Sequence, residues 1–91
     1  MTGPDFQART RILAKDSANI AVTTHARERM VERGITDQDV QQALLRGSIV
    51  DGPFINAHGN WQATLGRQLA GQEVQVVVAL ERQDVIVISV F

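Results

Sequence analysis

The sequence predicts an α+β fold in which N-terminal helices pack on a four-stranded antiparallel sheet. Apolar residues recur at helical spacing up to Gly47 and at alternate positions after it. The strand-like segments after Gly47 are joined by short connections, which favours antiparallel neighbours. The length of 91 residues and a hydrophobic content of 44% are typical of one globular domain. We therefore expect a single domain over residues 1–91, with a helical half at about 5–47 and the sheet at about 48–91.

The first predicted helix follows Pro4 and covers Asp5–Ala18. It has an acidic residue at its start and Lys15 near its end, which suits the helix dipole. The next segment, Asn19–Val22, is interpreted as a connector.

Two further helices are marked by the residues that begin and end them. Thr24 has the hydroxyl that an N-cap requires before residues 25–33, and Gly34 can end that helix in a left-handed conformation. Thr36 is the corresponding cap for Asp37–Arg46, where apolar residues fall at helical spacing. Both helices are therefore short.

Four segments show the alternation expected of strands. They are Ser48–Ile55, Trp61–Leu69, Glu73–Glu81 and Val85–Phe91. The last two are apolar on both faces, so we expect them at the centre of the sheet, under the helices.

Composition and charge narrow the classes of function. The chain has no cysteine, no apolar run of the roughly 20 residues that span a bilayer, and no signal-like N-terminus, so we expect a cytoplasmic protein. Its net charge of −1 argues against coating nucleic acid by bulk electrostatics. Seven of the nine Lys and Arg residues lie in residues 1–47, so an anion site is expected in the helical half.

The second helix aligns three basic side chains. At 100° per residue, His25, Arg29 and Arg33 drift through about 80° and form one stripe. This stripe lies beside Ala26 and Met30, which are expected to face the core. The basic groups should then emerge at the rim of the sheet.

This stripe has two interpretations. Arg offers a planar fork of donors that matches phosphate, and the pKa of an ordinary histidine permits proton transfer near neutrality, which together predict a phosphate-binding site. Alternatively, His25 pairs with Glu28 and Arg29 with Glu32, giving a solvated charged surface without function.

The segment Thr24–Thr36 resembles the signature of the domain-of-unknown-function family 4258. The resemblance continues through Asp39-Val40, Ala43-Leu44, Gly47, Gly66, Gly71, Val76–Val78 and Val85–Val90. That family has been grouped with RelE-like toxins among metal-independent ribonucleases that include barnase, EndoU and colicin nucleases. Their shared architecture is helices followed by a four-stranded antiparallel sheet.

The resemblance implies RNA cleavage by attack of the ribose 2′-hydroxyl on the adjacent phosphate. His25 would be the base or acid, and Arg29 and Arg33 would hold the scissile phosphate, with no metal or cofactor required. RNA, free or ribosome-bound, and a cognate antitoxin are the implied partners. The alternatives are a noncatalytic anion- or RNA-binding module and a structural interaction subunit.

Three further residues are candidates for substrate binding. Ser89 could bind a phosphate or could be a buried hydroxyl bonded to a neighbouring strand. His58 could be the second proton-transfer group, since the chain lacks the tyrosine that RelE-type nucleases often use, or a solvated turn residue. Trp61 could stack on a base or pack over the sheet edge. The two histidines lack the clustered spacing of zinc ligands, so no metal site is predicted.

Overall fold

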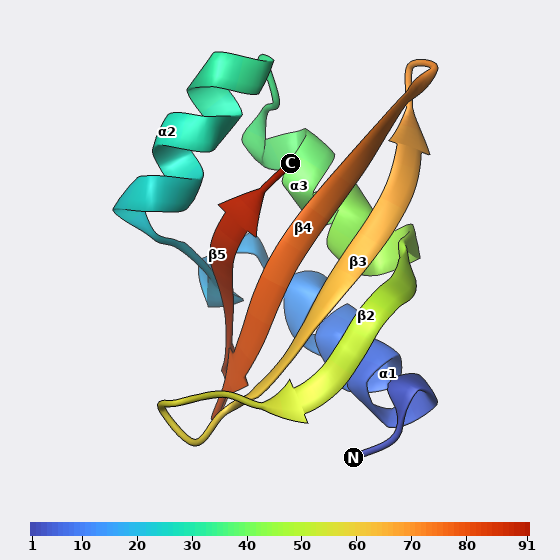
Figure 1. Ribbon diagram of the computed structural model, residues 1–91, viewed down its shortest axis with the longest axis vertical. Coiled ribbons are helices and arrows are strands. Elements are labelled where there is room, and N and C mark those ends of the chain that lie inside the picture. Colours follow the sequence, from blue (N-terminus) through green and yellow to red (C-terminus); the bar gives the residue numbers. More distant parts are fainter.

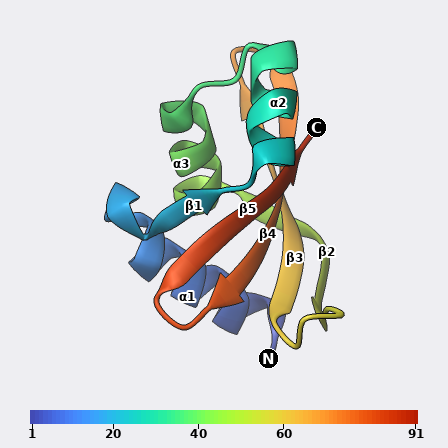
Figure 2. The same ribbon diagram turned by 90° about the vertical axis from the view of Figure 1, so that its left-hand side faces the viewer.

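Two helices cover one face of a five-stranded sheet and a third lies beside its edge (Figure 1). The computed structural model describes residues 1–91. Its helices are α1 (Gly3–Ala14), α2 (Thr24–Arg33) and α3 (Asp37–Arg46), and its strands are β1 (Ile20–Val22), β2 (Ser48–Ile55), β3 (Trp61–Leu69), β4 (Gln72–Glu81) and β5 (Asp84–Val90). Turned by 90°, the molecule shows α1 and α3 together on one side of the sheet (Figure 2). We call the opposite side, toward the viewer in Figure 1, the open face.

The sheet is mixed, which corrects the four-stranded antiparallel prediction. Its strand order is β1-β5-β4-β3-β2, and β2 to β5 form the expected antiparallel meander. The predicted connector contains the fifth strand, β1, which pairs in parallel with β5. Three residues are too few to show a period of two, and β1 exists because β5, at the far end of the chain, supplies its hydrogen-bonding partner.

The first helix is displaced toward the N-terminus relative to its prediction. Thr2 is its N-cap and forms a capping box with Asp5, so the helix begins at Gly3. It ends at Ala14, one turn early, because the Asp16 carboxylate accepts a hydrogen bond from the Ala18 N–H and starts a short 3₁₀ turn, η1.

The N-cap of α2 also differs from the prediction. Thr23, not Thr24, is the cap: its hydroxyl accepts a hydrogen bond from the Ala26 N–H at 3.1 Å. Gly34 ends α2 in the left-handed conformation with φ 66°, as predicted. The bounds of α3 and its Thr36 cap are likewise confirmed.

The core lies between the helices and the sheet. A single cluster of 17 buried residues joins the helical half to the strands, and Ala26 and Met30 belong to it, as the helical stripe predicted. The central strand is β4, and β5 lies between it and β1. No helix in the structure has the length and apolar character needed to cross a membrane.

One row of paired residues crosses the open face. It runs from Phe54 through Gln62, Ala79 and Ile86 to Ala21, with one residue on each strand. The neighbouring row on the other face is buried under the helices. Strands β4 and β5 are apolar on both faces, which led to the prediction that helices cover the sheet centre. On the open face, however, no helix lies over their apolar side chains.

Candidate functional site

Helix α2 lies along the end of β5, on the side that β1 does not reach. The pairing of β1 with β5 ends at Val87. Beyond this point, the Thr23 hydroxyl donates to the Ile88 carbonyl at 3.1 Å, and Arg29 Nε donates to the Val90 carbonyl at 3.4 Å. The side chains of Arg29 on α2 and of its N-cap Thr23 thus satisfy carbonyl groups that would otherwise form a bare sheet edge.

His25 and Ser89 meet at this junction. Ser89 Oγ lies 3.3 Å from His25 Nε2, and Ser89 is 8% exposed whereas His25 is exposed. The register between β4 and β5 shifts at Val77 and Val78, which marks a bulge in β5 just before Ser89. A bulge changes the direction in which the following side chains point. Here the Ser89 hydroxyl contacts His25 on α2 and not a side chain of a neighbouring strand.

The two arginines of the stripe have different surroundings. Arg29 is engaged twice, because in addition to Val90 it contacts Glu32 at 3.2 Å through Nη1. Arg33, one turn further, is half-buried and forms no hydrogen bond or ion pair. The predicted stripe is therefore one hydrogen-bonded arginine, one unpaired arginine and a histidine bound to a serine.

A pocket of about 640 Å³ occupies the open face near the β2–β3 turn. Its lining residues come from β3, β4, β5, that turn and the start of α2, and are Thr23, Asn56, Ala57, His58, Asn60, Gln62, Ala79, Glu81, Ile86 and Ile88. Thr23 and Ile88 lie just before His25 and Ser89 in the chain. The lining therefore runs from Thr23 and Ile88 to His58, and His25 and Ser89 themselves lie outside it.

Trp61 does not line this pocket. It packs against the hydrophobic core, on the same strand face as the buried Ala63 and Leu65. Phe54 is an aromatic residue on the open face, is 44% exposed and pairs across the strands with Gln62. The strand alternation of residues 48–55 could have identified Phe54, but the sequence gives no sign of which sheet face lacks helices.

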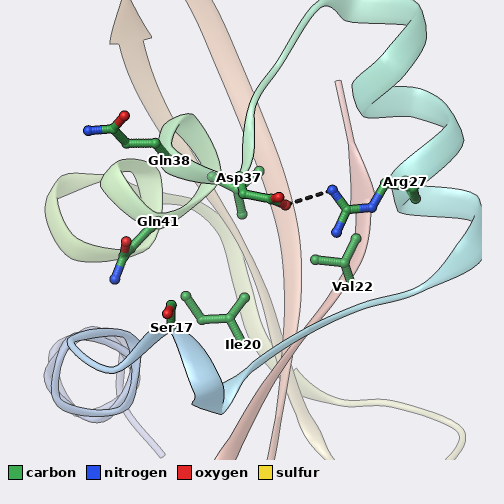
Figure 3. A pocket seen from close by; sticks show the side chains of 8 residues that line it. Ser17, Ile20, Val22, Arg27, Asp37, Gln38 and Gln41 are labelled. Carbon is green, nitrogen blue, oxygen red and sulfur yellow. Dashed lines mark hydrogen bonds and ion pairs between the residues drawn. The ribbon is translucent and has the colours of Figure 1, made fainter.

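A second pocket, of about 570 Å³, lies on the other side of α2, between β1 and α3 (Figure 3). Arg27 Nη1 and Asp37 Oδ1 form an ion pair 2.6 Å long at this pocket, with side chains 49% and 73% exposed. Arg27 thus belongs to a different surface of α2 from His25. No group of three or more His, Asp or Glu side chains converges as metal ligands would.

Comparison with known proteins identifies one family. No curated protein matches the sequence. Residues 22–91 match the family described as a domain of unknown function, DUF4258, so the match includes α2, α3 and strands β2 to β5 and omits α1. Because this match covers well over half of the sequence, the chain belongs to the DUF4258 family.

Proposed function

We propose that this chain is a RelE-like, metal-independent ribonuclease that cleaves RNA lying on the open face of the sheet. The observation that supports the proposal best is the contact of His25 with Ser89 beside the open-face pocket. A titratable ring held against a hydroxyl at the border of a concave surface is a suitable proton-transfer group.

The reaction needs no nucleophile from the protein. The ribose 2′-oxygen attacks the adjacent phosphorus, the bond from phosphorus to the 5′-oxygen breaks, and the products are a 2′,3′-cyclic phosphate and a 5′-hydroxyl. His25 takes the proton of the 2′-hydroxyl when neutral, or gives a proton to the departing 5′-oxygen when protonated. The Ser89 hydroxyl fixes the orientation of the imidazole ring.

Arg29 and Arg33 contribute differently to phosphate binding. Arg29 is held by Val90 and Glu32 through Nε and Nη1, which leaves Nη2 for a phosphate oxygen. Arg33 has no partner within the protein and offers its whole guanidinium group. Arg33 lies about 12 Å along the helix from His25, so we assign it a neighbouring phosphate of the RNA strand and assign the scissile phosphate to Arg29.

His58 is the proposed second proton-transfer group. It lines the pocket at the β2–β3 turn, whereas His25 lies beyond the lining residues Thr23 and Ile88. An RNA strand crossing the pocket would pass between the two rings, so that one acts as base and the other as acid.

A toxin of this kind requires a protein that neutralises it. We propose a cognate antitoxin that covers α2 or pairs with a free sheet edge, where β1 and β2 are the outer strands. A partner on α2 would cover the His25–Ser89 pair directly, whereas β2 lies at the opposite edge of the sheet.

The test is cleavage of single-stranded RNA by the purified protein, with products identified by mass. We expect cyclic-phosphate ends and a loss of at least about 100-fold in rate for His25→Ala, the usual contribution of a general acid or base. Arg27→Ala is the matched control, since Arg27 lies on the same helix but at the other pocket.

Two results would refute the ribonuclease. One is no cleavage by the wild-type protein, together with RNA binding that weakens with salt and with Arg33→Ala, which is the behaviour of a noncatalytic binding module. The other is an equal cleavage rate for wild type and His25→Ala.

A further inference from the structure

The β2–β3 turn fixes the orientation of one side-chain amide. Asn56 Oδ1 accepts hydrogen bonds from the backbone N–H groups of His58 and Asn60, at 2.9 and 3.1 Å. Because backbone N–H groups can only donate, the oxygen of Asn56 must face them. Its Nδ2 therefore points elsewhere, and it donates to Gln62 Oε1 at 3.0 Å.

This chain of hydrogen bonds determines what Gln62 presents to the pocket. Its Oε1 is occupied by Asn56, so its Nε2, with two N–H donors, is the free end of the amide. Gln62 lines the open-face pocket, and its Nε2 has no hydrogen-bond partner in the protein. The pocket thus contains an oriented hydrogen-bond donor, Gln62 Nε2, without an acceptor.

An unpaired acceptor lies near this donor. Glu81 lines the same pocket and forms no ion pair. Gln62 pairs with Ala79, and Glu81 is two residues further along β4, on the same strand face. Such diagonal neighbours are about 7–8 Å apart, a span that a planar base can bridge.

Apolar side chains form the remaining surface between these polar groups. Ala79 is 2% exposed, and Ile86 and Ile88 on β5 are half-buried. An apolar surface with a few oriented polar groups at its rim is typical of a site for a flat heterocycle.

We infer that this pocket is a guanine-binding subsite, an inference that rests on the proposed action on RNA. The Watson–Crick edge of guanine presents the O6 acceptor followed by the N1–H and N2–H donors. Gln62 Nε2 would donate to O6, and the two oxygens of the Glu81 carboxylate would accept from N1–H and N2–H. Adenine presents an amino donor and a ring-nitrogen acceptor. The Gln62 donor would then face a donor, and the Glu81 carboxylate would face an acceptor.

Nucleotide binding tests this subsite without using cleavage. We expect guanosine 3′-monophosphate to bind at least about tenfold more tightly than the adenosine, cytidine or uridine monophosphate by calorimetry. Gln62→Glu replaces the free donor by an acceptor and keeps the oxygen that Asn56 binds, and Glu81→Gln replaces a carboxylate oxygen by a donor. Each should remove the preference for guanosine, whereas Gln38→Glu, an equal charge change on α3, should retain it.

Several outcomes overturn the inference. Equal affinity for the four monophosphates would do so, as would a guanosine preference that survives both pocket variants. Tighter binding of the free monophosphate than of a guanosine-containing trinucleotide would assign the pocket to free nucleotides and refute an RNA subsite.

Failure of the subsite and failure of the nuclease are distinguishable. RNA cleavage that depends on His25, with no preference among bases, would refute the guanine subsite alone. A guanosine preference that Gln62→Glu abolishes, in a protein that cleaves no RNA, would refute the nuclease alone.

Discussion

Thr23→Ala should destabilise the fold through the loss of two hydrogen bonds made by one hydroxyl. That hydroxyl accepts from the Ala26 N–H at the start of α2 and donates to the Ile88 carbonyl on β5. Loss of an N-cap costs about 1 kcal/mol, and a half-buried carbonyl left without its donor costs about 1 kcal/mol more. The free energy of unfolding should fall by about 2 kcal/mol.

Urea and thermal unfolding measure this loss. A change of 1 kcal/mol shifts the melting temperature of a domain of this size by about 4–8 °C, so Thr23→Ala should lower it by about 8–16 °C. Thr23→Ser keeps the hydroxyl and should recover most of the stability. Because Thr23 adjoins the His25–Ser89 pair, the NMR signals of the His25 ring should move in Thr23→Ala and stay in Thr23→Ser.

Thr24→Ala is the decisive control. Thr24 is exposed and its side chain makes no hydrogen bond in the structure, so its replacement should change the free energy of unfolding by less than about 0.5 kcal/mol. If Thr24→Ala is as damaging as Thr23→Ala, the cap assignment is wrong. A Thr23→Ser variant as unstable as Thr23→Ala would refute the explanation that the two hydrogen bonds of the hydroxyl provide the stability.

Two further predictions concern other surfaces of α2. Met30→Ala should cost about 2–5 kcal/mol in urea unfolding because Met30 is 1% exposed in the core, whereas Val31→Ala, at a position 75% exposed, should cost less than about 0.5 kcal/mol. Equal losses would contradict the observed orientation of the helix. Arg27→Ala should cost less than about 1 kcal/mol, since its ion pair with Asp37 is largely exposed, and the loss should shrink in high salt. A larger loss that salt does not change would contradict this account of the pair.

The strands and the two short helices were predictable because their signals are local. The bounds of α3, β2 and β3 agree with the sequence prediction, and Gly34 has the expected positive φ. Caps, left-handed glycines and alternating apolar residues act within a few positions of one another. Two errors occurred where distant residues decide, at β1, which needs β5, and at Thr23, whose hydroxyl also bonds Ile88. The displaced bounds of α1 instead arise from local hydrogen bonds of Thr2 and Asp16.

The candidate site was predictable only in part. Helical spacing identified the stripe of His25, Arg29 and Arg33, because periodicity follows directly from the sequence. It did not indicate that Arg29 bonds the Val90 carbonyl while Arg33 stays unpaired, since this depends on where β5 ends against α2. Nor did it identify Gln62, whose free donor arises from a turn that fixes Asn56.

The α+β class, the order of most elements and the apolar side of α2 follow from the sequence alone, because propensity and periodicity are properties of neighbouring residues. Tertiary structure alone decided that the sheet has a fifth, parallel strand and one face without helices. It also decided that Ser89 meets His25 and that Gln62 and Glu81 share a pocket. Those contacts join positions far apart in the chain, and only the packing of α2 and the turn against the sheet brings their side chains together.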